Sequence, residues 1–177
     1  MTDLGEAAPG DVAYRWSPWR FAIAMAVVGF AAAAAVSLLF SALAADLRFP
    51  PVSDWVLFVG VYTLFFAAFS VLFTRSRPPS LRFGGEGVEL AAARRNAVWV
   101  PYRAVLSVQV RWMWPLSVLN VFVGLGDESQ VELFDRGGRR PLRRQKGKRL
   151  RFSLPLAGLG ASAATVRSEL RSRHLAE

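Results

Sequence analysis

The chain has no cysteine and a single histidine, His174, among its 177 residues. The lack of cysteine excludes disulfides, thiolate metal sites and a cysteine nucleophile. A single histidine is too few to supply the ligands of a zinc site, and with no cysteine and only this histidine near the end of the chain we expect no Ser-His catalytic pair. The candidate acid pairs, Asp127–Glu128 and Glu132/Asp135, fall in or beside turn sequences where carboxylates are simply solvated. We therefore expect no catalytic residue, no metal and no cofactor, so the protein is not an enzyme.

Charge is missing from two long apolar runs in the first half of the chain. Residues 21–43 contain no charged side chain over 23 positions, and residues 55–73 none over 19. A 23-residue helix is about 34 Å long, enough to cross a hydrocarbon core of roughly 30 Å. The alternative is a pair of buried helices in a soluble core, but a chain this small cannot enclose two such helices. We predict a transmembrane hairpin over residues 18–76.

The ends of this hairpin are marked by helix-boundary residues. Ser17 and Pro18 suit an N-cap followed by the first helical position, and Pro78–Pro79 stops the second helix. Trp16, Trp19 and Trp55 lie at the expected water boundary, where indole rings are enriched.

Basic residues are concentrated after the second run. From Arg75 onward the chain has nineteen basic and eight acidic residues, a net charge of +11, whereas residues 44–54 between the runs have one Arg and two Asp. The positive-inside rule then places the connection outside and both termini in the cytoplasm. We expect a two-pass protein of the bacterial inner (cytoplasmic) membrane, with a cytoplasmic N-terminal segment over residues 1–17 and a cytoplasmic domain over residues 80–175.

Small side chains recur every four residues in the first run, at Gly29, Ala33, Ser37 and Ser41. Such a stripe lets a second helix approach closely. The favoured interpretation is packing on the second run of the same chain, and the other is docking on a partner's helix. Neither run has enough polar groups for an ion or substrate path, so a channel or transporter acting alone is not expected.

After Pro79 the hydrophobic period shortens to alternating runs bounded by turn residues. The pattern predicts strands near residues 81–83, 88–92, 97–102, 105–112, 116–125, 130–135 and 150–156, with a hairpin turn at Arg136–Arg139. Leu159, Ala163, Val166 and Leu170 fall on one face of a C-terminal helix. The expected fold is a membrane α+β protein: an α-hairpin followed by a small antiparallel β barrel or sandwich with a capping helix.

Several of these segments resemble the bacterial pleckstrin-homology-like domains found next to transmembrane hairpins. The shared steps are the "GVEL" strand at Gly87–Leu90, "VPYRAV" at Val100–Val105, and the "LPL" step at Leu154–Leu156 before the closing helix. The resemblance covers roughly residues 75–175. It implies a small barrel or sandwich of two bent sheets that serves binding and scaffolding, without catalytic residues.

Two tryptophans flank a methionine in the sequence Arg111-Trp112-Met113-Trp114-Pro115. At strand spacing both indoles share one face. They either pack in the core or form an exposed aromatic patch that enters the lipid headgroup zone or seats a partner.

Residues 136–151 carry nine basic side chains in sixteen positions and no acid. Nucleic acid is not expected, because the run has no aromatic residue for base stacking. The run is either a solvated hairpin loop or a site for anionic phospholipid or an acidic partner. The candidate residues for lipid or partner binding are Arg136, Arg139, Arg140, Arg143, Arg144, Lys146, Lys148, Arg149 and Arg151, with Trp112 and Trp114.

These features predict a non-catalytic accessory or scaffolding subunit of a larger membrane complex, without a small-molecule substrate. The alternative is a stand-alone membrane protein that senses anionic lipid headgroups through its basic domain. The sequence leaves open which complex, which headgroup and which oligomeric state apply.

Overall fold

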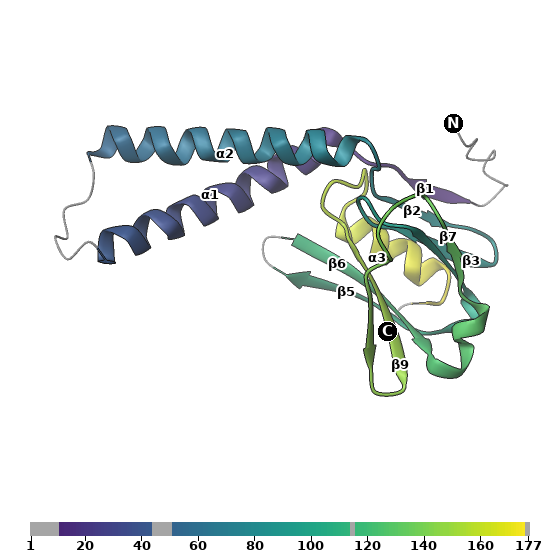
Figure 1. Cartoon of the computed structure of the whole chain (residues 1–177). Helices are drawn as coiled ribbons and strands as arrows, with labels where there is room; N and C mark the ends of the chain where they lie inside the picture. Colours follow the sequence, from purple (N-terminus) through teal and green to yellow (C-terminus); the bar gives the residue numbers. More distant parts are fainter. Residues whose placement is uncertain (1–10, 44–50, 114–115, 176–177) are drawn as a thin grey trace.

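The computed structural model describes residues 11–43, 51–113 and 116–175. It consists of a hairpin of two long helices and a β domain (Figure 1). The helices are α1 (Pro18–Leu43) and α2 (Val52–Arg75), and the domain ends in α3 (Ala163–Ser172). The predicted runs at 21–43 and 55–73 lie inside α1 and α2, so both are helical as expected.

Both long helices are apolar and mostly exposed. Each has a mean hydropathy of 2.4 over its most apolar stretch, and only 11% of that stretch is buried. Large side chains such as Leu39, Phe65 and Leu72 point away from the rest of the protein. The two helices therefore are not the buried core of a soluble domain. They are long and apolar enough to cross a membrane, because lipid is the solvent in which a helix can be apolar on all sides.

The helix boundaries follow the prolines. α1 begins at Pro18, where the missing N–H is not needed, and the Ser17 carbonyl accepts the first helical bond from Phe21 N at 3.0 Å. α2 begins after Pro51 and ends at Arg75, two residues before Arg77 and the following Pro78–Pro79. The predicted boundaries at Pro18 and before Pro78 are confirmed.

The β domain consists of two antiparallel sheets. The first has the order β1-β2-β3-β4-β7 and the second β5-β6-β9-β8. The strands are β1 (Val12–Tyr14), β2 (Ser80–Phe83), β3 (Gly87–Ala91), β4 (Ala97–Pro101), β5 (Val105–Met113), β6 (Leu116–Gly124), β7 (Glu132–Phe134), β8 (Arg143–Lys146) and β9 (Arg149–Pro155), with short 3-10 helices η1 (Tyr102–Ala104) and η2 (Leu125–Gln130). The described strands form two open sheets and do not close into a barrel.

The core lies between the two sheets and under α3. Alternate residues of β2, β4, β6 and β9 are fully buried, as the period of a strand requires. Val166 and Leu170 of α3 close one side of this core. The side chain of Ser162 caps α3 by accepting the Thr165 N–H at 3.1 Å. The predicted C-terminal capping helix is thus confirmed.

One strand comes from a segment that the sequence assigned to a separate N-terminal piece. Val12–Tyr14 forms β1, which pairs with β2 so that Val12 lies opposite Phe83. Asp11 and Arg82 add an ion pair with 2.6 Å between their charged atoms. Since the partner strand lies about seventy residues further along the chain, no local period marks β1.

The predicted hairpin turn at Arg136–Arg139 is wrong. β7 pairs with β4 in the first sheet, and β8 pairs with β9 in the second, so this segment crosses between sheets. The tight turn lies instead at Gly147, which has a φ of +60° between β8 and β9. Gly137 also has a positive φ, +65°. In sequence, both Gly137 and Gly147 are typical of a hairpin turn. Only the pairing of the flanking strands shows that the hairpin turn is at Gly147.

The start of α1 is tied to the loop before α3. Ser17 N donates to the Gly158 carbonyl at 2.6 Å, and Gly160 N donates to the Arg15 carbonyl at 2.8 Å. The Arg20 guanidinium donates to the Gly160 carbonyl at 3.0 Å. Gly158 has a φ of +84°, and a Cβ there would lie 2.7 Å from Phe21. Only glycine fits at this junction.

The end of α2 is tied to the domain as well. The Arg94 guanidinium donates to the Phe73 carbonyl at 3.3 Å and lies 3.8 Å from the centroid of the Phe73 ring. Arg77 donates to the Gly137 carbonyl. Because both helix ends are bonded to the β domain, the direction of the helices relative to the domain is set.

Candidate binding surface

The four strands of the second sheet contain no aspartate or glutamate. Their basic residues are Arg111, Arg143, Arg144, Lys146, Arg149 and Arg151. We call β5-β6-β9-β8 the acid-free sheet. The acidic strand residues Glu89 and Glu132 lie in the first sheet instead. The charge asymmetry seen along the sequence is therefore a spatial asymmetry between two sheets.

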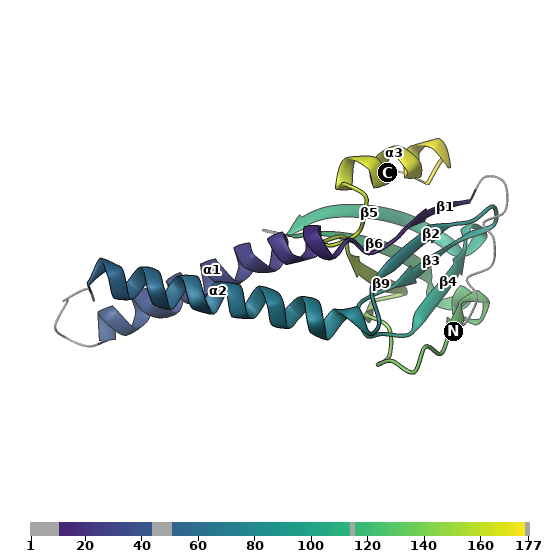
Figure 2. The same cartoon turned by 90° about the horizontal axis from the view of Figure 1, so that it is seen from above.

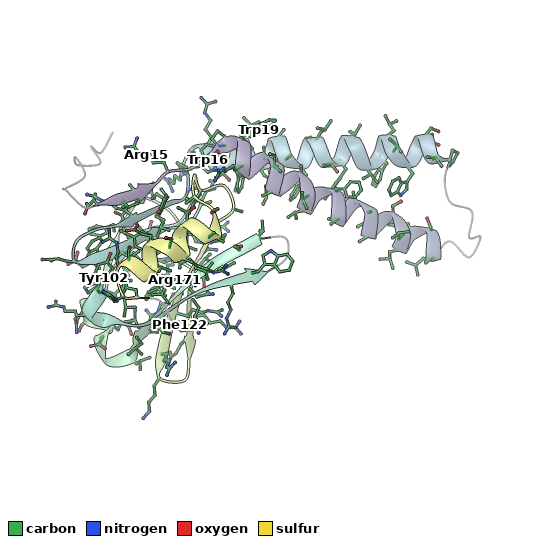
Figure 3. The ribbon with its side chains drawn as sticks, turned by 180° about the vertical axis from the view of Figure 1, so that it is seen from behind. Arg15, Trp16, Trp19, Tyr102, Phe122 and Arg171 are labelled. Atoms are coloured by element: carbon green, nitrogen blue, oxygen red, sulfur yellow. The ribbon has the colours of Figure 1, made fainter. Side chains whose placement is uncertain are left out.

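Strand register shows which of these cations share a surface. Leu150 and Phe152 of β9 are buried in the core, so Arg149 and Arg151 point outward. Arg144 of β8 lies opposite Arg151 on one side, and Phe122 of β6 lies opposite it on the other. The outward side of the acid-free sheet, which we call the basic face, carries Arg111, Arg144, Arg149, Arg151 and Phe122. Figure 3 shows Phe122 far from Trp16 and Trp19 at the start of α1.

The basic face is electrostatically unfavourable for the fold. Arg144 and Arg151 are directly opposite one another, and like charges in that position destabilise a sheet. The Nε atom of Arg151 is buried and lacks a hydrogen-bond partner among the described residues. A solvated strand face normally mixes both charge signs. An anion against this face would relieve the repulsion between the two guanidinium groups.

The first part of the basic run is held by a neighbouring turn. The Asn96 side-chain oxygen accepts the N–H groups of Arg136 and Gly138 at 3.1 and 2.9 Å. Arg139 N donates to the Arg94 carbonyl at 3.0 Å. The backbone of residues 136–139 is therefore held in place, whereas Arg144, Lys148 and Arg149 are solvent-exposed in the β8–β9 hairpin.

A groove of about 690 Å³ separates the free edges of β7 and β8. Val131, Leu133 and Phe152 supply apolar lining, and Arg140 and Arg143 supply cations. Arg143 forms an ion pair with Glu128, with 2.6 Å between the charged atoms. The structure thus divides the basic run between two surfaces: Arg144, Arg149 and Arg151 on the basic face, and Arg140 and Arg143 in the groove.

The remaining predicted residues fall in other places. Lys148 is exposed in the turn between β8 and β9, and Lys146 belongs to β8, although its side chain lies outside the described part of the structure. Trp112 is 67% exposed near the end of β5. Trp114 lies outside the described residues, so the expected pairing of the two indoles stays a prediction.

The stripe of small residues on α1 faces α2. Gly29 and Ala33 are buried, and a Cβ on Gly29 would lie 3.0 Å from the Phe66 ring. Ser37 and Ser41 are half-buried, and the Ser41 hydroxyl donates to the Ser37 carbonyl at 2.9 Å. The stripe therefore packs inside the hairpin, which is the interpretation that the sequence favoured.

A polar cluster that the sequence did not reveal joins α3 to the first sheet. Arg173 donates to Glu169 at 2.6 Å and to the Gly84 carbonyl at 2.6 Å, and Tyr102 donates to the same carbonyl at 2.8 Å. Burial raises the pKa of Tyr102, and the nearby Arg173 cation only partly offsets this. Burial also lowers the pKa of Arg173, but its bonds to Glu169 and Tyr102 outweigh that effect and the net pKa is raised. The cluster fixes α3 on the sheet.

Within the described residues, no three His, Asp or Glu side chains gather in a metal-binding arrangement. Comparison with protein families, curated proteins and solved structures finds no match to this chain. The fold and the site together define a two-sheet β domain with an acid-free sheet, fixed to a hairpin of two helices that are long and apolar enough to cross a membrane.

Proposed function

We propose that the protein is a non-catalytic accessory subunit of a larger complex in the bacterial inner membrane. The α1–α2 hairpin spans the membrane, and the basic face binds an acidic surface of a neighbouring protein on the cytoplasmic side. The acid-free sheet carries this proposal, because it gathers cations on one face without any compensating carboxylate on its own strands.

The direction of the β8–β9 hairpin supports a protein partner. Figure 1 shows its turn projecting across the direction of α1 and α2 rather than along it. Since both helix ends are bonded to the domain, the β8–β9 hairpin, which carries Arg144 and Arg149, extends sideways from the axis of the two helices. That is where the cytoplasmic part of an adjacent membrane protein lies. Arginine suits this contact because its guanidinium pairs with carboxylates through two parallel bonds.

The second candidate is a stand-alone sensor of anionic lipid headgroups. The same lack of acids favours it, since each Lys or Arg near an anionic leaflet contributes about 1 kcal/mol. The hairpin already anchors the chain, so lipid binding by the basic face would orient the domain rather than recruit it.

A pull-down of the tagged full-length chain from its native membranes in mild detergent tests both candidates. We expect a partner in fixed ratio to the wild-type chain, and its loss in the double variant Arg144→Glu/Arg151→Glu. Arg103→Glu/Arg171→Glu makes the same change in net charge outside the acid-free sheet and should keep the partner. A chain recovered alone, with bound anionic lipid lost in the first variant only, would support the lipid sensor instead. If neither protein nor lipid association depends on these arginines, both candidates fail.

A further inference from the structure

We infer that the end of the β5–β6 hairpin is a third membrane contact, in which Trp112 lies in the headgroup zone of the leaflet that the helices enter. We call Arg111, Trp112, Leu116 and Ser117 the hairpin tip. This inference goes beyond the proposed function, which concerns the basic face and a protein partner; the two surfaces share Arg111, and Trp112 belongs to the hairpin tip alone. It depends on the hairpin spanning the membrane but not on any partner.

The position of the hairpin tip supports a bilayer contact. Figures 1 and 2 show the β5–β6 hairpin pointing to the same side as α1 and α2, and Figure 1 shows it below the first turns of α1. Trp19, in those first turns, is 74% exposed and marks the level where indole rings meet the membrane surface. Because the junction at Ser17, Gly158 and Gly160 fixes α1 on the domain, inserting the helices brings the hairpin tip to the same leaflet.

The exposure of Trp112 is anomalous for its side of the strand. Val108 is buried in the core and Val110 is half-buried, and both share a strand face with Trp112. β5 and β6 therefore extend beyond the core, and the core-facing side of this extension is uncovered. An exposed indole is most stable at the membrane interface, where its ring contacts apolar lipid and its N–H contacts water or headgroups.

The neighbours of Trp112 fit headgroups. Ser117 lies opposite it on β6, and Leu116 is the first residue of that strand. Arg111 is exposed and has its Nε bonded to Gln109, which leaves the terminal nitrogens of the guanidinium to reach lipid phosphates. Neither β5 nor β6 carries an acid that an anionic leaflet would repel. The occupant of this surface is therefore the protein's own bilayer.

Because the chain has no cysteine, spin labels can be placed one at a time on the full-length protein in vesicles. Ser117→Cys reports on the hairpin tip, Leu106→Cys on the far end of β5, and Leu64→Cys on the middle of α2. Leu106 is 54% exposed and makes a matched control on the same strand. Collisions of each label with oxygen, which concentrates in lipid, are compared with collisions with a water-soluble nickel chelate.

We expect the label at position 117 to have a several-fold higher ratio of oxygen to nickel collisions than the label at position 106, with the label at position 64 higher still. Adding Trp112→Glu to Ser117→Cys should lower the ratio to that at position 106. Equal ratios at 117 and 106 would overturn the inference, and so would a water-exposed label at 64. A ratio unchanged by Trp112→Glu would overturn the role of Trp112.

Vesicles of phosphatidylcholine, with and without phosphatidylglycerol, separate the two parts of the contact. An indole contact survives in neutral lipid, whereas a contact made by Arg111 alone disappears there and overturns the assignment to Trp112. The partner pull-down with Trp112→Glu should be unchanged, so failure of this inference is distinguishable from failure of the proposed function.

Discussion

Replacing Arg144 with glutamate should stabilise the acid-free sheet while it removes binding by the basic face. Arg144 lies directly opposite Arg151 in the β8–β9 pair. At about 6 Å in water, two like charges repel by about 0.7 kcal/mol, and an opposite pair attracts by a similar amount. The full reversal is thus worth about 1.4 kcal/mol, reduced to about 0.5–1 kcal/mol by salt screening and side-chain entropy.

Hydrogen exchange of the β8–β9 amides, residues 143–155, measures this effect in the full-length chain, because exchange reports local opening. At about 0.15 M salt we expect protection to rise about threefold for Arg144→Glu. Arg144→Gln removes the repulsion without adding an attraction, so its gain in free energy should be about half as large. At about 1 M salt protection should hardly rise in either variant. Arg103→Glu changes the net charge equally outside this sheet and should leave the protection unchanged. A loss of protection in Arg144→Glu, or a gain that ignores salt, would refute the reasoning.

Three further predictions concern the hairpin, the basic run and the α3 cluster. Gly29→Leu should disrupt the packing of α1 on α2, because a Cβ at position 29 would lie 3.0 Å from the Phe66 ring. Gly60→Leu is the control and should be tolerated, because a Cβ at position 60 would have no atom within 4 Å. The yield of intrachain cross-links between α1 and α2 measures the difference. Asn96→Ala removes the acceptor of two N–H groups and should cost about 1–3 kcal/mol, seen as faster hydrogen exchange in residues 136–140 but not in 149–155. The pKa of Tyr102 is higher in the folded chain than its usual value of 10.0, so as the pH rises the unfolded chain loses this proton before the folded chain does. The neutral phenol therefore contributes to stability below pH 10.0, and this contribution declines above it. Melting temperatures from pH 8 to 11 should fall less steeply for Tyr102→Phe, and an equal slope would contradict this.

The helical hairpin could be predicted because its signal is local. The uncharged stretches define α1 and α2, and proline marks the start at Pro18 and the stop before Pro78. Most strands were also predictable from alternation, and β3, β4, β5 and β6 lie where the period places them. β1 and β8 were missed, because β1 has three residues and β8 reads as one charged run. In both, strand formation depends on a partner rather than on composition.

The candidate site could be predicted as a set of residues but not as a surface. The sequence identified the basic run, yet a run of cations has no period that assigns them to faces. The pairing of β8 with β9 places Arg144 and Arg151 on one side, and the bond to Glu128 holds Arg143 in the groove. Phe122 and Arg111 join the basic face from strands that lie far from the run in sequence.

The sequence by itself determined the two apolar helices and the excess of positive charge after them, because each depends on side-chain chemistry counted along the chain. Only the tertiary structure decided that the small-residue stripe faces α2, that one sheet is free of acids, and that the β5–β6 hairpin points to the same side as the two long helices. Those arrangements arise from contacts between residues distant in sequence. Strand register, and not local pattern, selects which of them form.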